Sequence, residues 1–199
     1  MVELILKVII ISISGALAPG PLTVATASWG VKRGWKAGLE ISLGHTFVEF
    51  PIVLLIGLGL MNFLKSEKFY FYLGILGSLF LFLFGILTIK DALIYKPPLI
   101  VKEKSSLPLL TGIALSFFNP YFLIWWLGIG TPLIYEAIKK SGFIGLSVLY
   151  IFHVSLDYFW LIFIATLSSF AKKKIYRYLL FILGIIIIYF GIKMLFVLF

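Results

Sequence analysis

Hydrophobic residues along this chain form six long runs separated by short polar segments. The runs cover residues 4–27, 37–60, 69–93, 107–133, 143–167 and 178–198. Each has about the twenty residues that an α-helix needs to cross the hydrocarbon core of a bilayer. The segments between them are too short and too polar to form a domain of their own. The pattern predicts an all-α membrane protein with six transmembrane helices and no enzymatic domain.

The composition supports lipid as the solvent of this chain. Hydrophobic residues make up 62% of the 199 residues and charged residues 13%, and the mean hydropathy is +1.14. A soluble domain could not keep so much apolar surface out of water. The chain has no cysteine, which excludes disulfides, thiolate metal sites and thiol redox carriers. We predict no cofactor.

Positive charges predict the orientation in the membrane. Most of the 17 lysines and arginines lie in the segments 32–36, 90–104 and 172–177, which the six-span pattern places on one side. By the positive-inside rule that side is the cytoplasm, so both termini are expected outside the cell membrane. The net charge of +9 then describes attraction to anionic lipid and not binding of nucleic acid. Lys90 and Lys193 lie near span ends and are expected to reach the interface.

Prolines interrupt the first and fourth runs at corresponding places. The interruptions are Pro19-Gly20-Pro21 and Asn119-Pro120. Proline lacks a backbone donor and breaks a helix interior, but it suits the first position of a helix, and Gly20 and Asn119 suit the N-cap before it. Inside lipid such a break is tolerated where the freed groups face protein or a polar cavity. A packing kink is the alternative interpretation.

Each break would begin a half-helix whose free N–H groups and positive dipole end face a cavity. Paired breaks of this kind indicate the binding site of a transporter. An α-carboxylate could bind there, with the hydroxyl of Thr23 nearby. The predicted substrate-binding residues at the breaks are Pro19, Gly20, Pro21, Thr23, Asn119 and Pro120.

Two histidine–acid pairs occur at matching places, His45 with Glu49 and His153 with Asp157. Residues four apart share one face of a helix, and an ionisable group in mid-membrane is a functional candidate. We expect Glu49 and Asp157 to hold a substrate ammonium group or coupling protons. The histidines are expected to serve proton coupling, because imidazole changes charge between about pH 5 and 8. Alternatively, each pair is an internal hydrogen bond that locks a helix interface.

The two halves of the chain share one order of motifs, namely a proline break, a His-x-x-x-acid pair, and a glycine followed by lysine. These motifs are Pro21, His45 with Glu49, and Gly85 with Lys90, then Pro120, His153 with Asp157, and Gly191 with Lys193. Because each half has three spans, the second half must enter the membrane from the opposite side. We therefore predict two inverted three-helix repeats, residues 1–95 and 107–199, with broken helices 1 and 4. Residues 96–106 are the predicted cytoplasmic linker.

Three segments of the chain resemble the lysine exporter (LysE/RhtB) family of amino-acid translocators. They are Pro19-Gly20-Pro21, the segment GVKRGWKAG at 30–38, and Asn119-Pro120. The resemblance extends over essentially the whole chain. It implies an exporter in the cytoplasmic membrane that moves basic or small neutral amino acids outward, coupled to proton antiport. Where such sequences commonly carry Gly-Asp in the second span, this chain has Gly44-His45, which bears on the choice of substrate.

Other functions remain open at this stage. Two imidazoles and two carboxylates would suit a divalent transition metal if the helices converge, so a metal-cation exporter is the alternative transporter. An intramembrane protease is disfavoured because the chain has neither a His-Glu-x-x-His nor a Gly-x-Ser-x-Gly motif. A purely structural membrane protein is a third interpretation. A homodimer is compatible with any of these.

Overall fold

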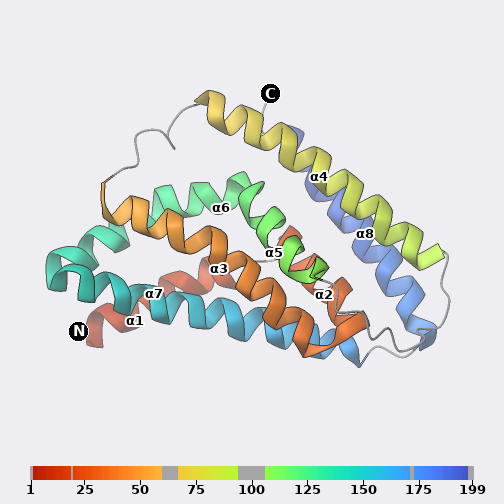
Figure 1. Ribbon diagram of the computed structural model, residues 1–199, viewed down its shortest axis with the longest axis horizontal. Helices are drawn as coiled ribbons and strands as arrows, with labels where there is room; N and C mark the ends of the chain where they lie inside the picture. Colours follow the sequence, from red (N-terminus) through yellow and green to blue (C-terminus); the bar gives the residue numbers. More distant parts are fainter. Residues whose placement is uncertain (1, 19, 60–66, 94–105, 171–172, 197–199) are drawn as a thin grey trace.

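The described part of the chain is helical, as the sequence predicts. The computed structural model describes residues 2–18, 20–59, 67–93, 106–170 and 173–196, and no strand occurs among them. The helices are α1 (Val2–Ala16), α2 (Pro21–Arg33), α3 (Trp35–Gly57), α4 (Glu67–Leu93), α5 (Leu107–Phe117), α6 (Pro120–Trp125), the π-helix η2 (Trp126–Gly130), α7 (Thr131–Ser169) and α8 (Lys173–Phe196), shown in Figure 1. Most of the predicted linker 96–106 lies outside the described residues.

Both predicted proline breaks begin a helix. Gly20 is the N-cap of α2, whose first residue is Pro21, and α2 is bent by 74° from α1. Asn119 is the N-cap of α6, and its side-chain oxygen accepts a hydrogen bond from the backbone N–H of Tyr121 at 3.1 Å. Proline at the first helical position costs no hydrogen bond, because that N–H would have no partner within the helix. Pro19 lies outside the described residues.

Two glycines with nearly the same backbone geometry reverse the chain. Gly34, between α2 and α3, has φ 62° and ψ −151°. Gly142, inside α7, has φ 57° and ψ −143°. These positive φ values favour glycine, since a Cβ is strained there. A Cβ on Gly145 would overlap the carbonyl oxygen of Ala137, so the two parts of α7 fold back against each other, as Figure 1 shows.

The helices pack in two groups. In the larger group α3 lies against α5 and α7, while α1 and α2 also contact α7. The pair α4 and α8 runs side by side and joins the larger group through α2 and α6 (Figure 1). A buried apolar core inside the larger group contains Leu4, Val8, Val53, Trp126, Ile134 and Leu149, among others. The site described below lies where these two groups meet.

Glycines allow two helix pairs to approach until their backbones touch. A Cβ on Gly112 of α5 would overlap the carbonyl of Ile41 in α3. Between α4 and α8 the contact is reciprocal: a Cβ on Gly85 would lie 2.9 Å from the carbonyl oxygen of Gly184, and one on Gly184 would lie 3.0 Å from that of Gly85. Small residues at helix crossings are typical of membrane proteins, where close van der Waals packing drives association.

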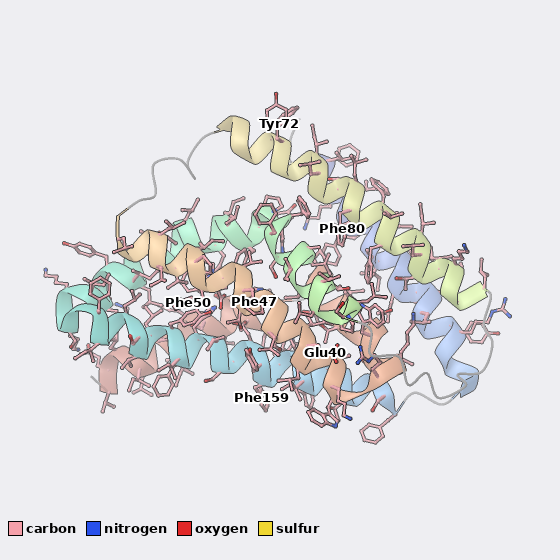
Figure 2. The ribbon with its side chains drawn as sticks, viewed as in Figure 1. Glu40, Phe47, Phe50, Tyr72, Phe80 and Phe159 are labelled. Carbon is pink, nitrogen blue, oxygen red and sulfur yellow. The ribbon has the colours of Figure 1, made fainter. Side chains whose placement is uncertain are left out.

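Large apolar side chains cover the outside of the molecule. Phe47 on α3 is 64% exposed and Phe159 on α7 is 65% exposed, and Figure 2 shows Phe159 at the lower edge of the molecule. Similar residues follow α4 and α8, among them Leu76, Leu79, Leu83, Ile182 and Ile185. An apolar surface of this extent is suited to lipid.

Two helices of the described part are long and apolar enough to span a membrane, Trp35–Gly57 and the continuous stretch Pro120–Ser169. The bent pair α1 and α2 makes up to three. At 1.5 Å per residue, the 50 residues of Pro120–Ser169 would be about 75 Å long, more than twice a hydrocarbon core of about 30 Å. The reversal at Gly142 divides this stretch. The described apolar parts of α4, α5 and α8 are shorter, so the count of six spans stays a prediction.

Candidate functional site

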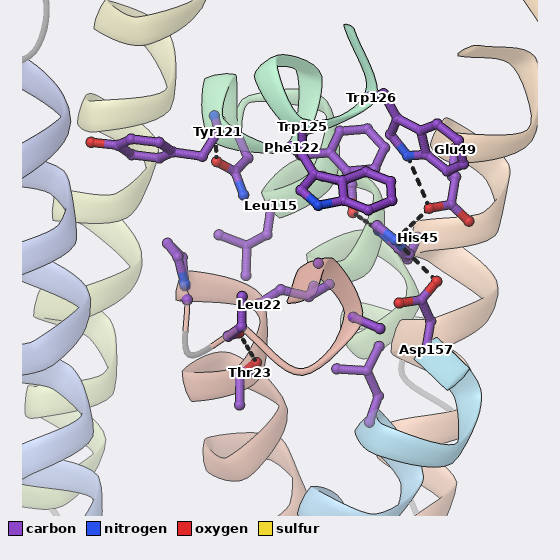
Figure 3. A pocket seen from close by; sticks show the side chains of 18 of the residues that line it. Leu22, Thr23, His45, Glu49, Leu115, Tyr121, Phe122, Trp125, Trp126 and Asp157 are labelled. Atoms are coloured by element: carbon purple, nitrogen blue, oxygen red, sulfur yellow. Dashed lines mark hydrogen bonds and ion pairs between the residues drawn. The ribbon is translucent and has the colours of Figure 1, made fainter. Parts of the chain in front are cut away.

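A cavity of about 360 Å³ lies where the two broken helices meet α3 and α7 (Figure 3). This volume is within the range of small-molecule sites. Eight of the residues predicted for the site line it, namely Gly20, Pro21, Thr23, His45, Glu49, Asn119, His153 and Asp157. Leucine, phenylalanine and tryptophan side chains make up much of the remaining wall, including Leu22, Leu115, Phe122, Trp125, Leu161 and Phe190.

His45, Glu49, His153 and Asp157 converge on one side of the cavity, and we call them the His/acid cluster. The Nε2 atom of His45 lies 3.3 Å from Glu49 Oε1 and 3.9 Å from Asp157 Oδ2. The Nε2 atom of His153 lies 3.2 Å from Glu49 Oε1 and 3.4 Å from Asp157 Oδ2. All four residues are buried. Each imidazole therefore faces the acid of its own helix and the acid of the other helix.

The second ring nitrogen of each histidine, Nδ1, contacts a serine hydroxyl. His45 Nδ1 lies 2.6 Å from Ser116 Oγ of α5, and His153 Nδ1 lies 2.8 Å from Ser12 Oγ of α1. The hydroxyl of Ser116 donates to the carbonyl of Gly112 at 2.7 Å, so its oxygen accepts from Nδ1–H of His45. With the proton on Nδ1, the Nε2 atom is left to face the carboxylates.

A tryptophan completes the contacts of Glu49. Trp126 is buried in the π-helix η2, and its Nε1–H donates to Glu49 Oε1 at 3.2 Å. The carbonyl of Trp126 accepts from the hydroxyl of Thr131 at 2.9 Å. Its ring also lies 4.7 Å from the ring of His153, centroid to centroid. The π-helix, which is a common irregularity at functional sites, thus places an indole directly over the cluster.

Two carboxylate oxygens of the cluster have no hydrogen-bond partner among the described atoms. They are Glu49 Oε2 and Asp157 Oδ2, both buried. A buried charged oxygen without a donor is costly in a membrane interior, where few other donors can replace water. Asp157 Oδ2 also lies within ion-pair distance of His153 Nε2, at 3.4 Å, so Glu49 Oε2 is the carboxylate oxygen best suited to receive a cationic or proton-donating ligand.

The broken helices supply the other polar groups of the cavity. The hydroxyl of Thr23, in the first turn of α2, donates to the carbonyl of Ala18 at 3.2 Å and accepts from Nε1–H of Trp160 at 3.4 Å. Gly20 has open space around it, since the nearest atom to an added Cβ is 3.9 Å away. The side-chain oxygen of Asn119 caps α6. The first-turn N–H groups of α2 thus lie next to open space.

Of the two remaining predicted residues, Pro19 lies outside the described part of the chain. Pro120 is buried as the first residue of α6 but does not line the cavity. Sequence reasoning missed Ser12, Ser116 and Trp126, although a serine inside an apolar helix is a signal for a polar partner. Lys193, which the sequence predicts at the interface, is exposed near the end of α8 and also lines the cavity.

Three residues of the cluster could hold a metal ion. One ligand atom each from His45, Glu49 and Asp157 lies within 4.8 Å of the other two. Imidazole and carboxylate ligands suit several divalent transition metals. These ligand atoms are thus close enough together to bind a metal ion. The same arrangement could instead bind a proton or an ammonium group.

The fold and the cavity define a multi-pass membrane protein with the features of a transporter: helices broken at matching places and buried ionisable groups beside the breaks. A model of the family described as "LysE type translocator" matches residues 13–197. The chain belongs to this family, whose members are transporters, and the family resemblance seen in the sequence is confirmed. No solved structure matches the chain.

One curated relative is the protein of Bacillus subtilis (strain 168) named "Putative amino acid efflux protein YcgF". The two chains are 26% identical over 132 residues, which cover 64% of this chain. The matched segment spans 62% of the relative's length.

Proposed function

We propose that this protein exports amino acids from the cytoplasm across the cell membrane in exchange for protons. The observation that carries the proposal is the cavity in which the start of α2 and the His/acid cluster face the same space. An amino acid is a zwitterion, so its site needs donors for a carboxylate and acceptors for an ammonium group. Family membership and the printed name of the Bacillus relative support amino acids as the cargo.

The two ends of the substrate would bind different parts of the cavity. Glu49 Oε2 has no hydrogen-bond partner and would accept from the ammonium group, together with Asp157 Oδ2, which also lies 3.4 Å from His153 Nε2. The N–H groups of the first turn of α2, which carry the positive end of the helix dipole, would donate to the carboxylate. The hydroxyl of Thr23 lies beside them.

Proton exchange would use the same cluster. Because Ser116 accepts from Nδ1–H of His45, a proton on Nε2 would lie between the imidazole and the two carboxylates. A proton there and a substrate ammonium group would satisfy the same carboxylates. The cluster would therefore hold either the proton or the substrate, which is the requirement for antiport.

Reciprocal contacts support two inverted repeats as the architecture. His45 contacts Ser116 of α5. In the other half, His153 contacts Ser12 of α1. Gly34 and Gly142 have matching dihedral angles, and the contacts of Gly85 mirror those of Gly184. Rocking of one repeat against the other would open the cavity to each side in turn. In this arrangement both termini lie outside the cell.

A divalent-metal exporter is the second candidate function. It is favoured by the ligand atoms of His45, Glu49 and Asp157, which lie within 4.8 Å of one another. Such an exporter would carry the ion through the cluster and would not need the apolar walls of the cavity.

Ligand-dependent thermal stability of the purified protein in detergent tests both candidates, because a ligand that binds the folded state raises the melting temperature. We expect neutral or basic amino acids to stabilise the protein, and Asp157→Asn to abolish the effect. Glu40→Gln is the matched control, since Glu40 pairs with Arg33 at 2.8 Å and does not line the cavity. Stabilisation by Zn²⁺ or Mn²⁺ alone would contradict the proposal and favour the metal exporter.

A further inference from the structure

We infer that the cavity selects amino acids with an apolar, uncharged side chain and that Lys193 binds their α-carboxylate. This inference rests on the proposed function and narrows its substrate class. It is carried by the charges of the cavity wall, the partners of those charges, and the apolar surface between them.

The negative charge of the cavity is confined to the His/acid cluster. Glu49 and Asp157 are the only carboxylates among the described residues that line it. The other described carboxylates with partners are engaged elsewhere. They pair as Glu40 with Arg33, Glu136 with Lys7, and Glu3 with Lys140. One carboxylate oxygen of Glu49 and one of Asp157 lie within 4.8 Å of each other, so a single ammonium group between them would contact both carboxylates at once.

A basic amino acid would therefore have an unpaired charge in this cavity. Its α-ammonium group would use the cluster, and its side-chain cation would have no carboxylate among the described lining residues. An unpaired cation against an apolar wall in the membrane is unfavourable. The lining thus discriminates against lysine and arginine by leaving one of their two cations without a partner.

The wall that remains for the side chain is apolar. It includes Leu22, Leu115 and Phe122 near the breaks, and Leu161 and Phe190 from α7 and α8. Burial of each CH₂ group against such a wall favours a branched or aromatic side chain over a small polar one. Figure 3 shows Leu22, Leu115 and Phe122 around the open space beside the cluster.

Lys193, an exposed residue of α8, supplies a cation to the cavity wall. It lies on α8, and Figure 3 shows α8 across the cavity from α3, which carries His45 and Glu49. The structure gives Lys193 no ion pair or hydrogen bond within the described part of the chain. An ammonium group at a cavity wall without an anionic partner can bind the substrate carboxylate, together with the first-turn N–H groups of α2. A cavity lined by an anionic cluster on two helices and a cation on a third is complementary to a zwitterion.

The test compares three ligands that differ in charge. Leucine has both α-groups and an apolar side chain, leucinamide lacks the carboxylate, and lysine adds a second cation. Affinities would be measured by titration calorimetry on the purified protein and on the variant Lys193→Gln. Lys90→Gln is the matched control, because Lys90 lies near the end of α4 and does not line the cavity.

We expect the wild-type protein to bind leucine more tightly than lysine. Lys193→Gln should weaken leucine binding by about tenfold, the loss of one charge-assisted contact, and leave leucinamide binding unchanged. Lys90→Gln should change neither affinity. Equal weakening of leucine and leucinamide, or no weakening, would overturn the role of Lys193. Tighter binding of lysine than of leucine would overturn the substrate class while leaving amino-acid export intact. Absence of binding by any amino acid would overturn the proposed function as well.

Discussion

His45 Nδ1 lies 2.6 Å from Ser116 Oγ. This contact joins α3, in the first half of the chain, to α5, the half-helix that ends at the proline break of the second half. The contact of His153 with Ser12 repeats the arrangement in the opposite direction at 2.8 Å. Each histidine is thus oriented by a helix from the other half. Movement of either broken helix would change the position of an imidazole next to the acids, so the geometry couples helix movement to the chemistry of the cluster.

Ser116→Ala should reduce export more than it reduces stability. The substitution leaves Nδ1–H of His45 without its acceptor, and a neutral hydrogen bond contributes about 1 kcal/mol. Such a loss corresponds to roughly a fivefold change in an equilibrium. We expect export from proteoliposomes to fall severalfold, while the melting temperature falls by only a few degrees.

Ser116→Thr provides the matched control for this variant, because it keeps a hydroxyl at the same position. It should restore most of the export rate. Normal export by Ser116→Ala would show that the serine does not position His45.

Glu49→Gln should abolish most transport without unfolding the protein. Glu49 Oε1 accepts from Trp126 and lies within 3.3 Å of both imidazole Nε2 atoms, and a glutamine amide can keep one of these contacts but not the negative charge. We expect the exchange rate in proteoliposomes to fall by at least about tenfold, since loss of one charge-assisted contact changes binding by that much.

Glu40→Gln, which changes the same residue type outside the cavity, should keep near-normal exchange. If Glu49→Gln transported at the wild-type rate, the cluster would only hold α3 and α7 together. The interpretation of the histidine–acid pairs as structural locks would then be correct.

Local features of the site could be predicted from the sequence because they depend on few neighbouring residues. Proline fixes φ and lacks a donor, so the helix starts at Pro21 and Pro120 follow from chemistry within one turn. The pairing of His45 with Glu49 follows from helix periodicity alone.

Features that depend on helix packing could not be predicted in this way. The approach of His45 to Asp157 requires α3 to cross α7 at one particular depth, and the apolar pattern of a membrane helix does not specify which face meets which neighbour. The sequence predicts only that Lys193 lies near the interface, because lysines near span ends usually reach it. Its place in the cavity wall depends on how α8 packs beside α2.

Gly142→Ala should destabilise the protein through backbone strain alone. Gly142 has a φ of 57°, and an added Cβ would meet no atom within 4 Å. A residue with a Cβ in this conformation costs about 1–2 kcal/mol. We expect the melting temperature to fall by about 2–4 °C for each kcal/mol in a chain of this size.

Gly128→Ala is the control for strain, because Gly128 also has open space around it but lies in η2 without a positive φ. It should leave the melting temperature nearly unchanged. Equal melting temperatures for wild type and Gly142→Ala would argue against the reversal of α7 at this position.

Gly112→Ala should separate Ser116 from His45 and reduce export together with stability. A Cβ on Gly112 would overlap the backbone carbonyl of Ile41, which cannot move aside as a flexible side chain could, so α5 must shift away from α3. Ser116 lies four residues further along α5 on the same face, and it would move with the helix. Thermal stability and proteoliposome export measured on the same preparation would both fall, and export would stay low when compared per folded molecule. Gly128→Ala should affect neither measurement. Normal export by Gly112→Ala would show that the imidazole of His45 stays next to the acids without close contact between α5 and α3.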